Sequence, residues 1–362
     1  MTLFPPVESV RVLVFGDSII DVYLHGETSR ISREAPIPIT DISHRDIKPG
    51  GAANVAANIA AIGAQCTLMG FVGDDPDTEA LKQLLSHQQV HCEWEVLPQQ
   101  KTRQSVRIIS RNQQLLRTDF RETLRPHNDL WLEHFNQQLT NTDIVVLSDY
   151  SGGSLDQAEK LIAAANKQGI PIIVDPTGSD YTPYYGATIL KPNHKEFEAI
   201  VGPCPTIEQI VTKGRIMLKD LNLKYLLVTL GSEGMLLLEQ QGDYLHIPSC
   251  AHEVFDITGA GDTVIGILAC FIAAGCSAKE AMQIANQAAG IVVQRFGTAS
   301  VSWDELHQQC LQSPTKPLQC GAVSLTDLLP QIKQSKKKHE KIVFTNGVFD
   351  LLHAGLVLVL VV

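Results

Sequence analysis

The hydrophobic positions of the chain fall into two kinds of segment. Short runs of apolar, often β-branched residues predict buried strands at residues 10–15, 65–73, 144–147, 170–174 and 225–229. Helical stretches separate these runs, among them an alanine-rich one that ends at Gly63. Because strand and helix alternate along the chain, the sequence predicts an α/β fold with a doubly wound, mostly parallel sheet.

Two stretches depart from this pattern. Residues 22–48 are rich in Pro, Ser and Thr and show only a weak alternation of isoleucines. Residues 103–119 alternate around a polar turn at 111–114. Such segments are typical of exposed strands and hairpins. We therefore expect both stretches to lie outside the main hydrophobic core.

The strongest candidate for chemistry is the run Asp256-Ile257-Thr258-Gly259-Ala260-Gly261-Asp262, which directly precedes an apolar helical stretch. Two glycines around one alanine permit a tight turn and leave N–H groups free at the positive end of a helix, which favours an anion. Asp262, in the first helical turn, is placed to accept a proton from a hydroxyl that attacks phosphorus. The alternative is that Asp262 and Thr263 only cap the helix.

A second candidate lies where the first predicted strand ends. Asp17 follows the strand at residues 10–15, and ligands of open α/β sheets bind beyond the carboxyl ends of the strands. Asp17 is therefore a candidate ligand contact. Asp21, four residues later, is better explained as a cap of a turn or helix.

Composition and charge narrow the possible functions. The chain has 362 residues, of which 44% are hydrophobic and 19% charged, so it can bury one large core and carry a second, smaller unit. The net charge of −10 argues against a nucleic-acid partner. The one basic cluster, at residues 336–338, is explained by a solvated helix face or a linker.

The cysteines and the N-terminus bear on location. Eight cysteines occur without a C-x-x-C pair and without histidines at metal-ligand spacing, so neither a zinc site nor a disulfide framework is indicated. Residues 1–6 lack the features of a signal peptide, and no apolar stretch approaches the roughly 20 residues that span a bilayer. We expect a soluble protein of the reducing cytoplasm, with no membrane partner.

The run at residues 256–262 resembles the C-terminal signature of the ribokinase-like, pfkB-type carbohydrate kinases. The resemblance covers about residues 8–305 and implies a three-layer α/β/α fold with a small β lid built from about residues 22–48 and 103–119. It also implies ATP and Mg²⁺ and leaves open a dependence on a monovalent cation. In such kinases the position of Asp262 is the catalytic base, and Gly259, Ala260 and Gly261 form the anion hole.

Further motifs of the family occur in its order. Asp17 and Asp21 resemble the first sugar contact of the family, although a cap is preferred for Asp21. Gly50, Gly51 and Asn54 resemble the N-terminal signature that approaches the sugar, with a plain helix N-cap as the alternative. Asn193-His194-Lys195-Glu196 resembles the Asn-x-x-Glu motif whose Asn and Glu organise Mg²⁺ and its water. The positions expected along ATP are Thr229, Gly231 and Gly234 at the phosphates and Asn286 at the adenine.

Arginines of the predicted lid indicate whether the sugar substrate already carries a phosphate. Arg107, Arg111 and Arg117 are expected to hold a phosphate that the sugar already carries. Solvated strand faces are the alternative explanation. Lysines that the family resemblance leads us to expect are replaced by Ser105, Gly152 and Thr177. These replacements remove three cations from the expected phosphosugar site.

Residues 314–362 narrow the choice among the carbohydrate kinases. After a predicted linker and helix at 314–340, residues 341–355 resemble the opening strand and H-x-G-H loop of cytidylyltransferase-like nucleotidyltransferases, with Leu356 at the second histidine. A kinase domain, here residues 1–313, followed by such a start is the arrangement of the bifunctional D-glycero-β-D-manno-heptose-7-phosphate kinase/heptose-1-phosphate adenylyltransferases. The about 22 residues of 341–362 are too few for a nucleotidyltransferase core, so we expect that half to be inactive or absent.

The sequence thus predicts a kinase that converts heptose 7-phosphate into the 1,7-bisphosphate for lipopolysaccharide core synthesis. Its expected partners are a small sugar phosphate, ATP and a second copy of the chain in a homodimer. One alternative is a ribokinase-like kinase that acts on an unphosphorylated sugar. The other is a catalytically weak paralogue that binds a sugar phosphate and regulates or scaffolds.

Overall fold

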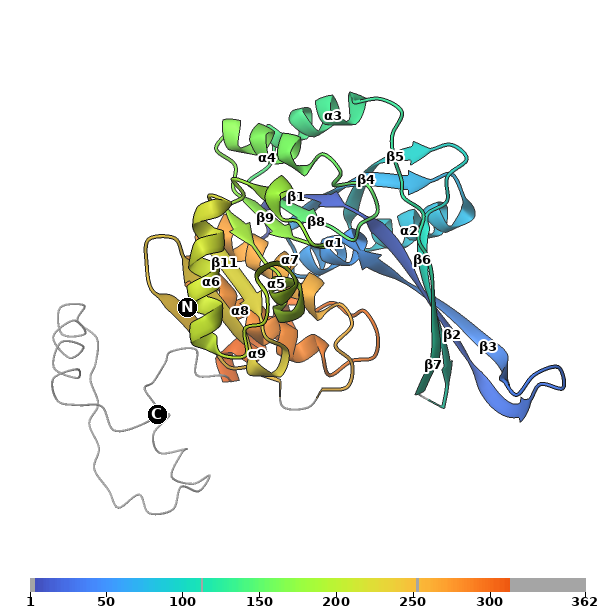
Figure 1. Cartoon of the computed structure of the whole chain (residues 1–362). Helices are drawn as coiled ribbons and strands as arrows, with labels where there is room; N and C mark the ends of the chain where they lie inside the picture. Colours follow the sequence, from blue (N-terminus) through green and yellow to red (C-terminus); the bar gives the residue numbers. More distant parts are fainter. Residues whose placement is uncertain (1–3, 112, 252–253, 313–362) are drawn as a thin grey trace, which may run out of the picture. The chain divides into compact units, whose positions relative to one another are not determined.

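A computed structural model describes residues 4–111, 113–251 and 254–312 of the chain. Within these ranges the strands form a nine-stranded sheet in the order β13-β12-β11-β10-β9-β8-β1-β4-β5 and a four-stranded sheet in the order β3-β2-β6-β7. Helices cover the larger sheet, and the smaller sheet projects from one side of it (Figure 1).

The larger sheet is parallel from β5 to β11, and its last two strands are antiparallel. Its strands are β1 (Arg11–Gly16), β4 (Gln65–Gly73), β5 (Val90–Leu97), β8 (Ile144–Ser148), β9 (Ile172–Asp175), β10 (Ile189–Leu190), β11 (Tyr225–Thr229), β12 (Met235–Glu239) and β13 (Tyr244–Ile247). The predicted doubly wound, mostly parallel sheet is confirmed. The antiparallel edge formed by β12 and β13 was not expected from the sequence.

Two hydrophobic clusters lie on the two faces of this sheet. Successive residues of β1 divide between them, because side chains of a strand alternate in direction: Val12 and Val14 join one cluster, and Leu13 and Phe15 join the other. The first cluster includes side chains from α1 (Ala52–Ala61), α2 (Pro76–His87), α7 (Ala260–Ala273), α8 (Ala278–Val292) and α9 (Trp303–Gln312). The second includes side chains from α3 (Leu130–Leu139), α4 (Ala158–Lys167), α5 (His194–Val201) and α6 (Ile207–Asp220). The expected three layers are therefore present.

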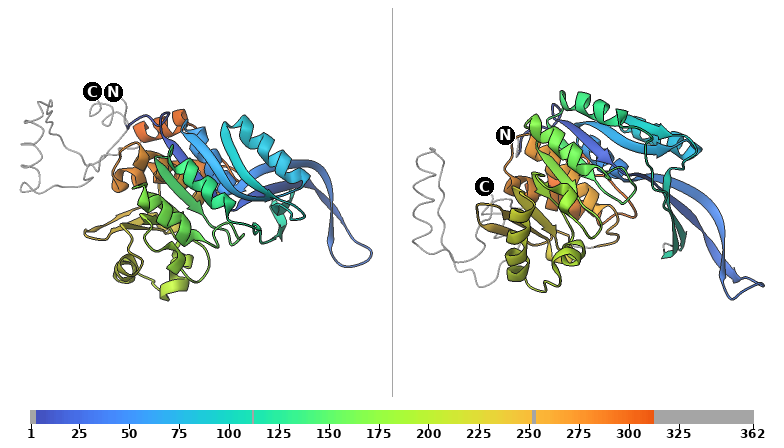
Figure 2. Two further views of the ribbon diagram at one scale, coloured as in Figure 1. Left: turned by 90° about the horizontal axis from the view of Figure 1, so that it is seen from above. Right: turned by 45° about the horizontal axis from the view of Figure 1, so that its top comes forward.

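The smaller sheet corresponds to the predicted lid. It contains β2 (Ser18–Ile31), β3 (Pro38–Gly51), β6 (Arg103–Ser110) and β7 (Gln113–Phe120). Figure 2 shows β2 and β3 reaching far from the larger sheet. The expectation of exposed strands holds only for their outer part, because Val22 and Tyr23 near the base are buried.

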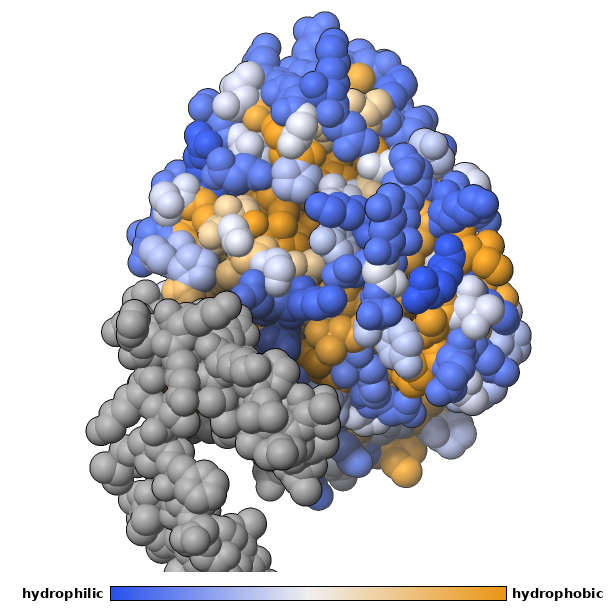
Figure 3. All heavy atoms as spheres, turned by 90° about the vertical axis from the view of Figure 1, so that its left-hand side faces the viewer, coloured by the Kyte–Doolittle hydropathy of each residue, from blue (hydrophilic) through white to orange (hydrophobic). Residues whose placement is uncertain are grey.

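The surface of the described part shows no long apolar helix. Among residues 4–111, 113–251 and 254–312, none of the helices is both long and apolar enough to cross a bilayer. On the face drawn in Figure 3, apolar residues form separate patches between polar ones, which is ordinary for a protein surface. In the described ranges, six cysteines are free thiols: Cys66, Cys92, Cys204, Cys250, Cys270 and Cys276. The predicted segments 314–340 and 341–362 lie outside the described residues.

Candidate active site

The candidate site lies at the carboxyl edge of the larger sheet. Polar residues follow several adjacent strands there: Asp17 after β1, Tyr150 after β8, Asp175 at the end of β9 and Lys191 after β10. The N-terminus of α7 brings Asp262 to the same edge, where the side chains of Asp175, Tyr150 and Lys191 interact with its charge. This is the location at which open α/β sheets bind ligands.

The start of α7 depends on a glycine. Gly259 precedes the helix with a φ of 78°, in the left-handed region, and a Cβ added to it would lie 2.7 Å from Nδ2 of Asn54. A side chain is therefore disfavoured there by both conformation and space. Gly259, Ala260 and Gly261 bring the first-turn N–H groups of α7, which lack partners one turn earlier in the helix, to the carboxyl edge of the sheet. Their role as an anion hole stays a prediction.

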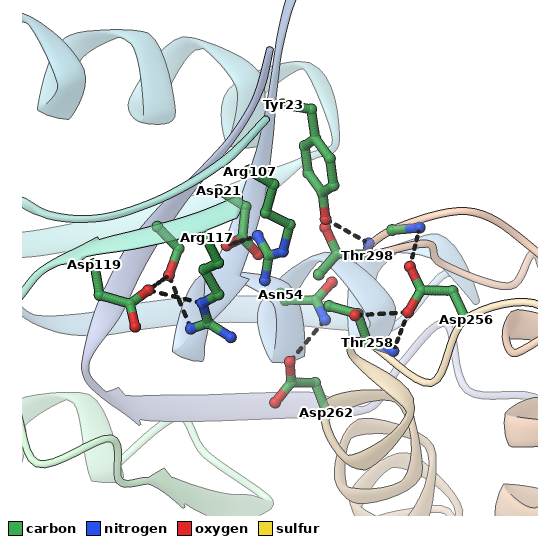
Figure 4. Close-up of polar contacts among 12 residues, drawn as sticks. Asp21, Tyr23, Asn54, Arg107, Arg117, Asp119, Asp256, Thr258, Asp262 and Thr298 are labelled. Carbon is green, nitrogen blue, oxygen red and sulfur yellow. Dashed lines mark hydrogen bonds and ion pairs between the residues drawn. The ribbon is translucent and has the colours of Figure 1, made fainter. Parts of the chain in front are cut away.

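Asp262 is buried and accepts a hydrogen bond on each carboxylate oxygen. Asn54 Nδ2 donates to Oδ2 over 2.8 Å, and Tyr150 Oη donates to Oδ1 over 2.7 Å. Burial raises the pKa of Asp262 to about 6, although these two hydrogen bonds and the positive charge of Lys191 favour the ionised form. A carboxylate that titrates just below neutral pH suits a general base. Figure 4 shows Asn54 pointing at Asp262.

The motif Gly50-Gly51 contains the helix N-cap that was the alternative explanation. Gly51 occupies the N-cap position of α1, with a φ of 56° and no side-chain cap, while Asn54 lies inside the helix. Gly50 lies against Asp21, because a Cβ added to it would be 2.8 Å from Oδ2 of that carboxylate. The predicted Gly50-Gly51 and Asn54 motif thus brings the backbone to one acidic side chain and an amide to another.

Lys191 was not identified from the sequence. Its side chain is 3% exposed, its Nζ lies 2.9 Å from Oδ1 of Asp175, and a Cβ added to Gly261 would be 3.5 Å from Nζ. The positive charge therefore lies against the first turn of α7. Burial raises the pKa of Asp175 to about 7, opposed by Lys191. The available signal was a lysine placed directly after a buried strand, two residues before Asn193.

Asp17 contacts the backbone of the loop that follows β8. Its carboxylate accepts hydrogen bonds from three backbone N–H groups, those of Tyr150 at 2.9 Å, Gly152 at 2.7 Å and Ser154 at 3.1 Å. Arg103 Nη1 lies 3.7 Å away. These contacts make Asp17 an anchor for the loop at 149–154, and its expected contact with the sugar stays a prediction.

The prediction that Asp21 is a cap is wrong. Asp21 lies within β2, and it accepts a hydrogen bond of 2.6 Å from Arg107 Nη1 in a buried ion pair. Burial raises the pKa of Asp21, and Arg107 opposes the rise. Its charge also acts on Asp262. Asp21 is therefore a functional candidate, although the sequence analysis preferred a cap for it.

The lid contacts the body through Tyr23. Arg107 lies 5.1 Å and Lys48 Nζ 5.3 Å from the centre of the Tyr23 ring, and the Tyr23 hydroxyl accepts a hydrogen bond of 3.2 Å from Thr298 N. Lys48 Nζ also donates to the carbonyl of Phe296 over 3.0 Å. Figure 4 shows Tyr23, with its bond to Thr298, and Arg107 beside Asp21. The base of the lid is therefore tied to the loop at 294–299.

The three predicted phosphate-binding arginines do not lie together. Arg107 and Arg117 face each other across β6 and β7, whereas Arg111 is exposed in the turn between these strands. Arg117 donates to Asp119 over 2.8 Å and to Ser105 Oγ over 3.0 Å. At about 3.3 Å per residue, Arg111 is about 13 Å along the strand from Arg107. The structure thus brings Arg107 and Arg117, but not Arg111, near the base of the lid.

Two of the missing lysines have a local explanation. Ser105 Oγ donates to Oδ1 of Asp119 over 2.6 Å, so this position takes part in the Arg117 network. A Cβ at Gly152 would collide with Arg103 Nη1 and with Oδ1 of Asp17. The Arg103 guanidinium, which donates to the carbonyl of Tyr150 over 2.7 Å, therefore fills the space beside Gly152. No contact in the structure explains the replacement at Thr177.

The residues predicted to bind the nucleotide lie near β10 and β11 and on α8. Asn193 and Glu196 form a capping box at α5, and Asn193 forms a β-bridge with Thr229. Gly231 and Gly234 follow β11 with φ of 61° and 92°. Asn286 on α8 is buried and donates to the carbonyl of Pro248 over 2.8 Å and to Cys250 Sγ over 3.1 Å. The structure brings Asn193 to Thr229, and their contacts with ATP stay predictions.

Known proteins resemble the chain over its described length. The model of the pfkB family carbohydrate kinases matches residues 10–305. "Bifunctional protein HldE" of Nitrosococcus oceani is 49% identical over 352 residues, which cover 97% of this chain and 74% of the relative. The protein of the same name from Alcanivorax borkumensis is 45% identical over 352 residues, with the same shares covered.

Solved structures with low sequence identity have the same fold. Arabidopsis thaliana ribokinase in complex with ribose and ATP aligns with a TM-score of 0.67 and 24% identity, over 85% of this chain and 99% of that chain. Phosphofructokinase-2 from Escherichia coli in complex with fructose-6-phosphate aligns with a TM-score of 0.68 and 22% identity, over 83% and 97%.

Proposed function

The chain belongs to the pfkB family of carbohydrate kinases, and from this premise we propose that it phosphorylates the anomeric hydroxyl of D-glycero-β-D-manno-heptose 7-phosphate. It is an ATP-dependent sugar kinase. The observation that carries the chemistry is the buried carboxylate of Asp262, held by Asn54 and Tyr150 at the start of α7. Identity of 45–49% to bifunctional HldE proteins over 97% of the chain supports the heptose substrate.

The arrangement of Asp262 and α7 supports one order of bond changes. The anomeric hydroxyl lies at Asp262, which accepts its proton as the oxygen attacks the γ-phosphorus of ATP. The bond between the γ-phosphorus and the bridging oxygen breaks, and ADP leaves. The positive end of α7, which begins at Gly259, Ala260 and Gly261, faces the transferred group, and the Lys191 ammonium lies beside this turn.

Arg117 is the best-placed cation for the phosphate already on the sugar. Its side chain is 47% exposed and is held in a fixed orientation by Asp119 and Ser105. A planar guanidinium binds a phosphate through paired hydrogen bonds. Arg107 is only 7% exposed and is already paired with Asp21, so its task is to hold that carboxylate at the sugar.

The donor set fits a magnesium ion held largely by ATP and water. Asn193 and Glu196 offer an amide and a carboxylate oxygen at the start of α5, and Mg²⁺ typically takes one or two protein carboxylates together with phosphates and water. Within the described ranges, His, Cys, Asp and Glu form no cluster of three or more suited to a metal, which agrees with this sparse coordination. Bound there, the ion neutralises phosphate charge. Dependence on a monovalent cation stays open.

The cellular location and the oligomeric state are further parts of the proposal. ATP is available and free thiols stay reduced in the cytoplasm, so we place the chain there. Exposed apolar residues on the lid strands, among them Ile31, Leu116 and Phe120, support association of two copies as a homodimer.

Release of ADP with a panel of sugars tests the proposal. The panel contains heptose 7-phosphate, the same heptose without phosphate, and hexoses with and without a terminal phosphate, and ATP alone sets the background. We expect the highest kcat/KM with heptose 7-phosphate. Equal values with and without the phosphate would favour a kinase of unphosphorylated sugars, and absence of turnover by a folded, ATP-binding protein would favour the weak paralogue.

A further inference from the structure

Tyr150 connects a loop to the catalytic carboxylate. It is the second residue after β8, and its side chain is 37% exposed, yet its hydroxyl points inward and donates to Oδ1 of Asp262 over 2.7 Å. Burial and the charge of Asp262 raise the pKa of the phenol well above its usual value. The phenol therefore keeps its proton and acts as a hydrogen-bond donor throughout the working pH range.

The backbone that carries Tyr150 is fixed from two sides. Asp17 accepts hydrogen bonds from the N–H groups of Tyr150 and Gly152, and Arg103 Nη1 donates to the carbonyl of Tyr150 over 2.7 Å. Both anchoring side chains are buried. Asp17 holds the N–H groups of this loop and Arg103 holds a C=O group, so the phenol of Tyr150 has little freedom to move. The absence of a side chain at Gly152 gives Arg103 the space to reach this position.

We propose that Tyr150 is a positioning residue for phosphoryl transfer, which holds the Asp262 carboxylate in the orientation that accepts the proton of the sugar hydroxyl. The proposal rests on the proposed kinase function. An ionised carboxylate has about four acceptor sites. Asn54 and Tyr150 use one on each oxygen, so each oxygen keeps a site for the substrate. The proton passes from the sugar to Asp262, and Tyr150 neither gains nor loses one.

The charged and titratable groups around Asp262 decide how the phenol affects its pKa. Tyr150, Lys191, Asp21 and Asp175 face the carboxylate from the loop after β8, the segment after β10, the lid strand β2 and the end of β9. The phenol and the lysine favour the ionised form, whereas Asp21 opposes it. Loss of the phenolic donor therefore raises the pKa of Asp262, because a hydrogen bond to the charged form has been removed.

The test compares Tyr150→Phe with Tyr185→Phe, an exposed tyrosine in another loop, under the same assay. For Tyr150→Phe we expect kcat to fall by roughly 10- to 100-fold, the KM for ATP to stay unchanged, and the acid limb of kcat/KM to move to higher pH. Tyr185→Phe should match the wild type in all three. An unmoved acid limb in Tyr150→Phe would overturn the proposal, even with a lower kcat.

A second measurement protects the test against a misfolded variant. Site-specific 3-fluorotyrosine at position 150 keeps the hydroxyl but makes it a stronger donor, so the acid limb should move to lower pH. A shift in the opposite direction, or none, would contradict the proposal. Failure of the proposed function would appear differently, because the wild-type chain itself would then show no sugar-dependent ADP release.

Discussion

Asn54 donates a hydrogen bond of 2.8 Å to Asp262 although the two residues are 208 positions apart in the chain. The same two helices are joined again where Thr263 Oγ1 donates to Oδ1 of Asn58 over 2.9 Å. The N-terminal and C-terminal sequence motifs are therefore two halves of one structure, in which α1 fixes the side chain that α7 presents. Disruption of either half should affect the catalytic carboxylate.

Replacement of the base is the most direct test of the mechanism. Asp262→Asn should lower kcat by roughly 10²- to 10⁴-fold, because general-base catalysis contributes about that much, while ATP binding measured by calorimetry stays close to wild type. In the wild type, kcat/KM should fall as pH drops through about 6, since Asp262 becomes protonated there. Asp180→Asn, at an exposed loop position, is the control. A variant with wild-type turnover would remove Asp262 from its role.

Lys191 offers a second test, since its charge lies against the first turn of α7. Lys191→Met should lower kcat more than it raises the KM for ATP, because the charge matters most when the phosphoryl group is in transfer. The acid limb should move to higher pH, since Lys191 favours ionised Asp262. Lys195→Met, on the exposed side of α5, controls for loss of a cation. Equal effects of the two variants would argue against the assigned role.

The sequence predicted the alternation of strands and helices better than it predicted the contacts of the site's side chains. The strands at 65–73 and 225–229 agree with β4 and β11 residue for residue, because short, mostly apolar runs mark buried parallel strands clearly. The assignment of Asp21 to a cap was wrong, and the backbone contacts of Asp17 were not foreseen. Their spacing says nothing about which carboxylate meets backbone N–H groups and which meets a cation, since both partners come from distant strands. Lys191 was missed for the same reason.

Tyr23 is predicted to secure the lid. In Tyr23→Phe the N–H of Thr298 loses its acceptor, and a buried donor left unpaired costs about 1–3 kcal/mol. We expect a lower midpoint of thermal unfolding and a higher KM for the sugar, with a smaller change in kcat. Tyr244→Phe, at the exposed edge strand β13, is the matched control. An unchanged midpoint together with an unchanged KM would show that this contact does not hold the lid.

The crowding at Gly152 predicts a coupling with Arg103. Gly152→Ala should lower the free energy of unfolding by about 1–3 kcal/mol, because the new methyl group collides with Arg103 and Asp17. In an Arg103→Ala background the same substitution should cost less, since one of the two colliding groups is gone. A double-mutant cycle by urea denaturation measures the difference. Strict additivity would mean that Arg103 does not occupy the space beside Gly152.

Arg117 provides the test that separates the proposed substrate from its alternatives. If Arg117 holds the 7-phosphate, Arg117→Ala should raise the KM for heptose 7-phosphate by roughly 10-fold or more, because a hydrogen bond to a charged group contributes about 1.5–3 kcal/mol. The KM for the unphosphorylated heptose should barely change. Arg111→Ala, in the exposed turn of the same lid hairpin, removes an equal charge at a greater distance and should leave both values near wild type. An equal loss for both sugars would mean that Arg117 supports the lid through Asp119 and Ser105 and does not bind the phosphate, whereas equal KM values for the two sugars in the wild type would point to a kinase of unphosphorylated sugars.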